Sequence, residues 1–305
     1  MSHPLPRIHR VAAGLIGLGL LTFGAVAARA GAAGTSVGTV NGTRVIRGVE
    51  ARVALWVSRD RVIEAHAAAE AALDRVERAL LDAPSDAGLA AAAAAWTRST
   101  DGAYDPAALP LYQLWERCRA AGRVPREDEI VLERGVGAAG YGLVAAGWAA
   151  DLASQELRAS GFGDHLVAAG PIEVVSGTRG GRPWRLAVEH PAGTGILALG
   201  VQRPGALIRL YHDVEFFRAD GCSFAGLLDP RSGRPVHGTA FVLAFAPRAA
   251  DAAALAAAVP VIGPSEGIRL ASTVPGCELI AVGADGALHA SAGINLRDGM
   301  LDWKP

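Results

Sequence analysis

Residues 100–115 read TDGAYDPAALPLYQLW, a Tyr-Asp-Pro turn among aromatic residues that include Tyr104 and Trp115. Aromatic residues make up only 6% of the chain, so their density marks this segment. An aromatic-rich turn is either a packing corner or the wall of a binding site. The segments on both sides of it bear on that choice.

The first thirty residues have the composition of a secretory signal peptide. Residues 1–10 carry arginine and histidine but no acid, and residues 11–27 are an apolar run. Ala28-Arg29-Ala30 then places small residues around a cleavage position. We expect cleavage, export to the periplasm or beyond, and a mature domain of residues 31–305. The alternative is an uncleaved anchor, although the run is short for a bilayer span and is interrupted by glycines.

Charge and cysteine content narrow the class of protein. The formal net charge is −1, which gives no electrostatic reason to expect nucleic acid or an anionic membrane as a partner. In an oxidising compartment the three cysteines, Cys118, Cys222 and Cys277, allow one disulfide and leave one thiol over. The sequence does not say which pair would form, and it shows no cysteine or histidine spacing typical of a metal site.

Hydrophobic periodicity predicts a mixture of helices and strands. Apolar residues recur three and four positions apart over residues 61–81, which indicates an amphipathic helix. Residues 36–57 are rich in β-branched residues around Asn41-Gly42, which predicts strands that turn at this pair. The segment around Pro125 has the composition of a basic loop. Further helices are expected at 86–96, 140–160 and 249–262, with strands between 165 and 246 and a hairpin turning at Asp285-Gly286. The predicted fold class is α+β, in one domain.

Taken in order, these segments resemble the ApbE family, the FAD:protein FMN transferases. Gly102-Ala103-Tyr104-Asp105-Pro106 is similar to the family's Gly-Ala-Phe-Asp-Pro segment, and GWAADLASQELRASGF at 147–162 to its Lys-Gly-Tyr-Ala-x-Asp helix. DGCSFAGLLDPRSGRPV at 220–236 is similar to the strand ending in Asp-Pro-x-Thr-Gly-x-Pro, and PWRLAVEHP and the Gly263 region also fit. The order and spacing hold from near residue 49 to residue 293.

The resemblance implies a periplasmic enzyme that splits FAD and attaches the FMN half to a Thr or Ser hydroxyl of a target protein, using Mg²⁺. It also implies that Ala103, Tyr104 and Asp105 line the FAD site. An aromatic ring can cover a flavin face, and a carboxylate can accept hydrogen bonds from ring N–H or ribose hydroxyl groups. The other interpretation is a packed turn that has lost its ligand.

The positions that hold the metal in the family are not matched. Transfer from a pyrophosphate needs a cation with oxygen ligands, and the family supplies an Asp and, four residues later, a Thr. Counted without gaps across residues 247–263, these positions fall on Ala253 and Ala257, whose side chains cannot ligate. Asp251, two residues before Ala253, would lie on another side of the helix. The replacement ligands to consider are Asp251 and Asp213, with His212, His237 and Glu173 in nearby segments.

Other polar positions of the family are replaced as well. Its Lys before Gly-Tyr-Ala falls on Ala146, the Asp opening that motif on Gly140, and the His ahead of Ile-Asp-Pro on Gly226. The residues that do match hold backbone turns, and Asp229 is predicted to be structural for the same reason. Three tryptophans are predicted to be core residues, namely Trp115, Trp148 and Trp184.

We therefore expect a divergent FAD:protein FMN transferase homologue of weak or absent activity. FAD is the candidate ligand, the missing ligands argue against Mg²⁺, and the candidate partner is a target protein with an acceptor Thr or Ser. Two alternatives stay open. One is a non-catalytic periplasmic homologue that binds flavin or a protein, and the other is an active transferase with a rebuilt metal site. Nucleic acid is not an expected partner, and no stable membrane span is expected once the signal is cleaved.

Overall fold

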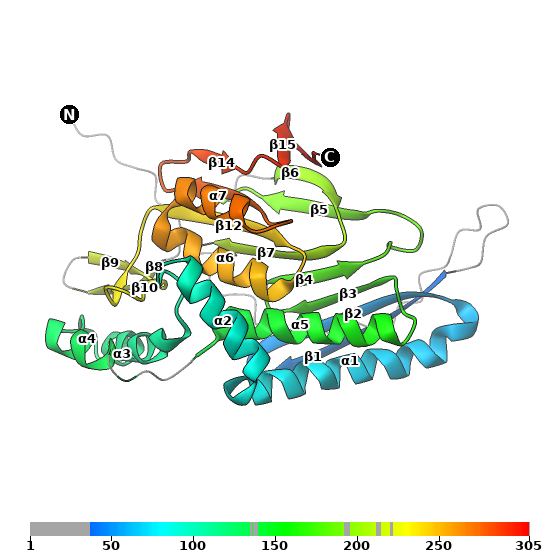
Figure 1. Cartoon of the computed structure of the whole chain (residues 1–305), viewed down its shortest axis with the longest axis horizontal. Helices are drawn as coiled ribbons and strands as arrows, with labels where there is room; N and C mark the ends of the chain where they lie inside the picture. The colour runs from blue at the N-terminus through cyan, green and yellow to red at the C-terminus, as the bar shows by residue number, and fades with distance from the viewer. Residues whose placement is uncertain are drawn as a thin grey trace. The chain divides into compact units, whose positions relative to one another are not determined.

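An eight-stranded antiparallel sheet is the centre of the fold (Figure 1). The computed structural model describes residues 37–134, 136, 140–191, 196–211, 215–219 and 222–304, so the predicted signal peptide lies outside the described residues. In spatial order the strands are β1 (Val37–Ile46), β2 (Val49–Ser58), β3 (His165–Ala169), β4 (Ile172–Ser176), β7 (Gly205–Tyr211), β12 (Thr239–Ala246), β13 (Glu278–Gly283) and β14 (Leu288–Ala290). The first strand of the described chain, β1, and the late strand β14 thus form the opposite edges of the sheet.

Smaller sheets complete the strand content. A four-stranded sheet has the order β15 (Ile294–Arg297), β16 (Met300–Trp303), β6 (Ile196–Gln202) and β5 (Trp184–Glu189). Two short hairpins pair β8 (Glu215–Ala219) with β9 (Cys222–Ala225) and β10 (Leu228–Asp229) with β11 (Arg234–Pro235). We call the four-stranded sheet the small sheet.

Helices cover one face of the large sheet (Figure 1). They are α1 (Val62–Asp82), α2 (Ala87–Ser99), α5 (Gly142–Ala159), α6 (Ala249–Ile262) and α7 (Pro264–Thr273). Alanine dominates their buried faces, so the helices approach one another closely. The tightest approach is at Gly147 of α5, where an added Cβ would lie 2.5 Å from the carbonyl oxygen of Ala249.

The small sheet packs on part of the opposite face. Its inward residues Leu186, Val188 and Leu301 form a second buried cluster with Leu207 and Phe241 of the large sheet. A third cluster joins α3 (Leu109–Ala120) and α4 (Glu127–Arg134) to the short hairpins, with Trp115 buried at its centre. In the part of the chain that the structure describes, no helix is both long and apolar enough to cross a bilayer.

The α+β prediction is confirmed, but the turn predicted at Asn41-Gly42 is wrong. Both residues lie inside β1, paired with Ala54 and Val53. The chain turns at Arg47-Gly48 instead, where both residues have positive φ (50° and 82°), as a tight β-hairpin requires. Gly42 serves packing, because a Cβ there would lie 3.0 Å from Leu73 of α1.

The segment after Pro125 is a helix, α4, and not the predicted loop. Its single buried residue, Ile130, anchors it on α3, so it shows little of the periodicity that predicts helices. The helices predicted at 61–81, 86–96, 140–160 and 249–262 and the hairpin turning at Asp285-Gly286 are confirmed. Among the predicted core tryptophans, Trp115 and Trp184 are buried, whereas Trp148 is half-buried. All three cysteines are free thiols.

Candidate functional site

The predicted flavin-contacting loop begins where α2 ends. The backbone N–H of Gly102 donates to the carbonyl of Thr97 (2.9 Å) and that of Asp101 to Arg98 (3.3 Å), and Asp101 is left-handed at φ 49°. This is a Schellman stop, usually built with glycine at the left-handed position. The Thr100 hydroxyl then accepts a hydrogen bond from the N–H of Tyr104 (3.1 Å) and fixes the loop that follows.

The three residues predicted to line the FAD site lie in this loop. The loop is closed, in the sense that its side chains pack into the protein and leave no open wall. Ala103 and Tyr104 are buried in the helix-side core. The Asp105 carboxylate accepts a hydrogen bond from the N–H of Ala107 (2.8 Å) and so caps the short turn Pro106–Ala108. The Tyr104 hydroxyl has no hydrogen-bond partner in the described part of the chain, and its burial raises the pKa of the phenol. Only Asp105 therefore presents a polar group near the surface.

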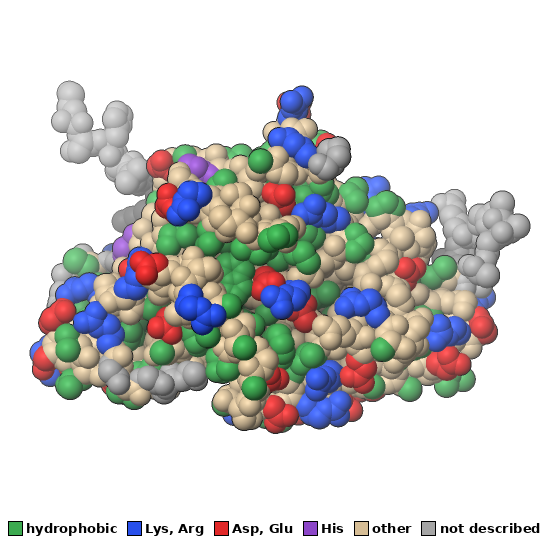
Figure 2. All heavy atoms as spheres, viewed as in Figure 1, with side chains coloured by type: hydrophobic (Ala, Val, Ile, Leu, Met, Phe, Trp, Pro, Cys, Tyr) green, Lys and Arg blue, Asp and Glu red, His purple; other side chains and the backbone are tan. Residues whose placement is uncertain are grey.

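Ala253 and Ala257 lie in the middle of α6. Ala253 is fully buried in the helix-side core, and Ala257 is partly buried against it. Figure 2 shows hydrophobic side chains gathered in a hollow over α6, next to α2 and α7. The α6 side chains that reach solvent are apolar as well, namely Ala257, Val261 and Ile262.

Asp251, the first replacement ligand considered, is held in a different network. Its carboxylate accepts a hydrogen bond from the indole Nε1 of Trp96 on α2 (2.8 Å). The guanidinium of Arg248 binds both of its oxygens, at 2.7 and 2.9 Å. These bonds tie α2 to the start of α6 and occupy the lone pairs that a metal ion would need.

Asp151 is the polar residue of this region that sequence reasoning missed. Its two carboxylate oxygens accept hydrogen bonds from the N–H groups of Ala249 (2.8 Å) and Ala250 (3.1 Å) at the N-terminus of α6. Burial, reinforced by the nearby Asp251 carboxylate, raises the pKa of Asp151 to about 6 against these hydrogen bonds. A signal was present, because Asp151 stands where the family's Lys-Gly-Tyr-Ala-x-Asp helix carries its Asp.

The remaining candidates do not gather around α6. Glu173 pairs in register with Leu207, whose side chain lies under the small sheet, so Glu173 is on the face opposite the helices. There it makes an ion pair with Arg209 (2.9 Å). His237 is exposed between β11 and β12, and His212 and Asp213 lie outside the described residues. Asp229 accepts hydrogen bonds from the N–H and guanidinium of Arg231, which agrees with its predicted structural role.

The residues present do not fit a Mg²⁺ ion at the family's position. Mg²⁺ prefers carboxylate oxygens in octahedral geometry. The two expected ligand positions are alanines, and the carboxylates of Asp151 and Asp251 are already bonded within the protein. Within the described ranges, no group of three His, Cys, Asp or Glu side chains is placed to hold a metal.

The family model of the ApbE family matches residues 44–281. The chain belongs to the ApbE family. This match confirms the resemblance drawn from the ordered segments. The curated relatives are named FAD:protein FMN transferases. An FAD:protein FMN transferase of Rhodobacter capsulatus is 31% identical over 157 residues, which cover 51% of this chain and 30% of the relative. One of Treponema pallidum (strain Nichols) is 32% identical over 180 residues, covering 53% and 48%. The chain thus aligns with half or less of the length of these two ApbE relatives.

Solved ApbE structures share the fold over almost their whole length. The ApbE protein of Thermotoga maritima superposes with a TM-score of 0.68 at 23% identity, covering 84% of this chain and 97% of that structure. The flavin transferase ApbE of Vibrio cholerae gives 0.67 at 18% identity, covering 84% and 98%. Sequence identities this low show that the fold is shared and do not show that the chemistry is shared.

Proposed function

We propose that the protein is an exported, flavin-binding member of the ApbE family that does not transfer FMN. Its relatives are FAD:protein FMN transferases, which supports a flavin nucleotide as the ligand. The predicted signal peptide supports export. The proposed loss of FMN transfer is supported by the residues at the start of α6.

The observation that carries the proposal is that Asp251, the only aspartate in α6, is already bonded within the protein. Transfer from FAD requires a cation that takes up the charge developing on the phosphates. Where relatives would need ligands, this helix offers Ala253 and Ala257, and Asp251 is bound by Trp96 and Arg248. A cation could recruit Asp251 only by breaking a buried hydrogen bond and an ion pair, which is costly.

Flavin binding is supported by the hollow over α6. Its hydrophobic lining (Figure 2) suits an aromatic ring system better than a diphosphate. The closed loop with Tyr104 and Asp105 follows α2, which contacts α6 through the Trp96–Asp251 hydrogen bond. We infer that the ring system is the recognised part of the ligand.

The test is a titration of the purified protein with FAD, followed by tryptophan fluorescence, in Mg²⁺ and in EDTA. We expect saturable quenching of equal affinity under both conditions. In parallel, a Thr-containing target is incubated with FAD and examined for in-gel flavin fluorescence, with the Treponema pallidum relative as positive control. We expect no fluorescent band from this protein.

Two results would redirect the proposal. A Mg²⁺-dependent fluorescent band would show an active transferase and point to Asp251 and Asp213 as rebuilt ligands. An absence of FAD binding would favour the second candidate, a protein-interaction homologue. The burial of Ala103 and Tyr104 is the observation that favours this candidate, because a closed loop leaves no flavin wall.

A further inference from the structure

The outer face of the small sheet carries an unusual concentration of exposed hydrophobic side chains. Ile196, Leu199 and Val201 of β6 are 58%, 44% and 47% exposed, and Met300 of β16 is 49% exposed. They are contiguous, because Leu199 pairs with Ala187 on one side and with Met300 on the other. Contiguous apolar patches on a soluble surface mark interaction sites. We call these residues the β6 patch.

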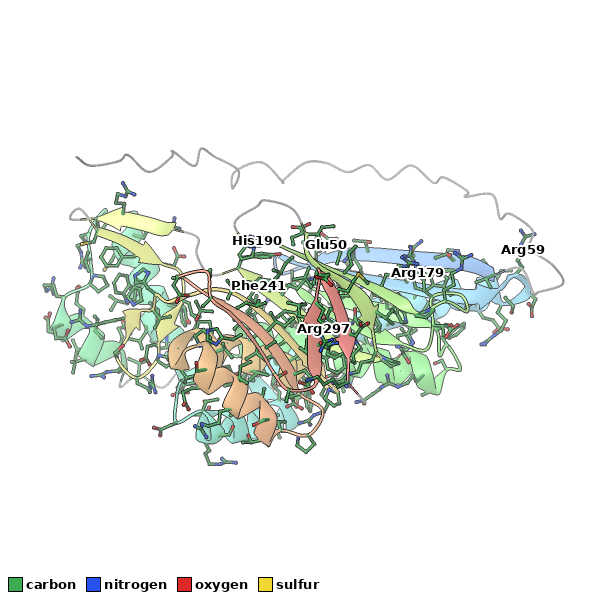
Figure 3. All side chains as sticks on the ribbon, turned by 90° about the horizontal axis from the view of Figure 1, so that it is seen from above. Glu50, Arg59, Arg179, His190, Phe241 and Arg297 are labelled. Carbon is green, nitrogen blue, oxygen red and sulfur yellow. The ribbon has the colours of Figure 1, made fainter. Side chains whose placement is uncertain are left out.

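Charged residues border the β6 patch on both sides. Arg185 and Glu189 of β5 lie opposite Val201 and Ile196. On the other side Asp302 follows Leu301, the partner of Gly200, and therefore lies beside Val201. Arg297 of β15 pairs with Met300, on the same row as Leu199. Among the described residues, none of these four charges has an ion-pair partner. Figure 3 shows Arg297 on the strands of the small sheet, turned toward the viewer's side of the molecule.

This arrangement is complementary to itself. Arg185 and Asp302 flank the apolar Val201 at equal depth on opposite sides. A two-fold axis parallel to the strands, in the plane of the face, would bring Arg185 of each copy over Asp302 of the other. The same axis lays the apolar rows on each other, sets Met300 against Ala187 and leaves Arg297 beyond the edge strand β5. A perpendicular axis through the Leu199 row would instead oppose the two copies of Arg297, which repel, and would pair Arg185 with Glu189.

We propose that the protein forms a two-fold homodimer through the β6 patch, with reciprocal Arg185–Asp302 pairs at its rim. Two-fold homodimers use the same surface on both copies, so a self-complementary face is what such an interface requires. Face-to-face packing of two sheets is a common way to bury apolar strand residues. An unrelated partner would not require opposite charges on the two sides of the same row.

The test begins with the mass of the purified protein, measured by light scattering across a dilution series. We expect twice the mass of one chain at high concentration and a return to one chain on dilution. Leu199→Glu places a charge in the centre of the patch and should abolish the dimer. Leu288→Glu is the matched control, because Leu288 is 45% exposed on β14 of the large sheet and is not part of the β6 patch, so this variant should keep the dimer. Thermal unfolding of both variants checks that they fold.

The charge arrangement is tested separately. Arg185→Glu should weaken the dimer by at least about tenfold, since it opposes like charges. Adding Asp302→Arg to Arg185→Glu should restore it, whereas adding Glu189→Arg should not. A wild-type protein that stays monomeric at all concentrations, or equal masses for the Leu199 and Leu288 variants, would overturn the proposal. Rescue by Glu189→Arg alone would overturn the proposed axis.

Discussion

The hydroxyl of Tyr104 is a buried polar atom without a described partner, in a loop where the Thr100 hydroxyl and the Asp105 carboxylate both accept backbone hydrogen bonds. Leaving such a group unpaired costs about 1–3 kcal/mol. Tyr104→Phe keeps the packing and removes the hydroxyl, so it should raise the free energy of unfolding by about 1 kcal/mol. Urea unfolding measures this.

Tyr112→Phe is the control for that experiment. The Tyr112 hydroxyl accepts a hydrogen bond from the N–H of Leu228 (3.3 Å), so its removal should destabilise the protein. If Tyr104→Phe were also destabilising, the Tyr104 hydroxyl would have a partner in solution, such as an ordered water.

Restoring metal-ligating side chains at Ala253 and Ala257 of α6 tests whether their loss is what prevents Mg²⁺ binding. Ala253→Asp with Ala257→Thr restores the side chains that relatives are expected to use. Because Ala253 is fully buried, the new carboxylate should lower the melting temperature in EDTA. With FAD present throughout, adding Mg²⁺ should then raise the melting temperature of this variant and not that of the wild type.

A second double variant separates ligation from burial. Ala254→Asp with Ala258→Thr has the same spacing one residue further round the helix, at two positions that are both fully buried. It should be destabilised without any response to Mg²⁺. Equal responses of the two double variants would mean that α6 is not the metal-facing helix.

Among the helices, a close backbone approach joins α5 to the start of α6. An added Cβ on Gly147 would lie 2.5 Å from the Ala249 oxygen and 2.8 Å from the Ala250 nitrogen, both backbone atoms that cannot give way singly. Gly147→Ala should therefore cost about 2–3 kcal/mol of stability in thermal or urea unfolding. Gly163→Ala, with nothing within 4 Å of the new Cβ, should stay close to the wild type. Equal effects would show that the helices can separate at little cost.

The elements that the sequence predicts well are those whose burial is periodic. α1 repeats its buried alanines and leucines every three or four residues, and β5 alternates strictly between buried and exposed. The helix α4 was not predicted because it buries only one residue, against α3. The turn at Gly42 was wrongly predicted because the small size of this residue allows contact with α1 and does not mark a turn.

The parts of the candidate site that could be predicted from the sequence are those where the type of residue at a position is informative by itself. The alanines at positions 253 and 257 are visible in the sequence, whereas the partners of Asp251 are not. Trp96 lies 155 residues from Asp251 in the chain, and only the packing of α2 on α6 brings them together. Asp151 matches the Asp of the family's helix, but its two bonds to backbone N–H groups of α6 could not be predicted, because any sequence carries such groups.

For the molecule as a whole, Asp151 makes stability depend on pH. Its pKa is about 6 in the folded protein against an ordinary 3.8, so the folded state binds a proton that the unfolded chain releases. The resulting contribution is present below about pH 4, is lost as the pH rises through 6, and amounts to about 3 kcal/mol. Burial lowers the pKa of His165, which gives a slope of opposite sign as the pH falls below 6.5.

Comparison with Asp151→Asn isolates the Asp151 contribution from that of His165. The difference in the free energy of unfolding between the wild type and this variant should be larger at about pH 4 than at pH 7, by up to about 3 kcal/mol. Urea unfolding at both pH values measures it. A difference independent of pH would mean that the Asp151 carboxylate ionises normally in the folded protein.

The carboxylates at the start of α6 also decide which part of a nucleotide the protein can hold. The positive end of a helix dipole is a natural site for phosphate, because its free N–H groups point outward. In α6 two of those N–H groups already face Asp151, and Asp251 stands in the first turn with Arg248 as its counter-ion. A diphosphate would meet negative charge there. Riboflavin, which carries no phosphate, should therefore bind about as tightly as FAD in the same fluorescence titration, because the protein would recognise the ring system rather than the nucleotide.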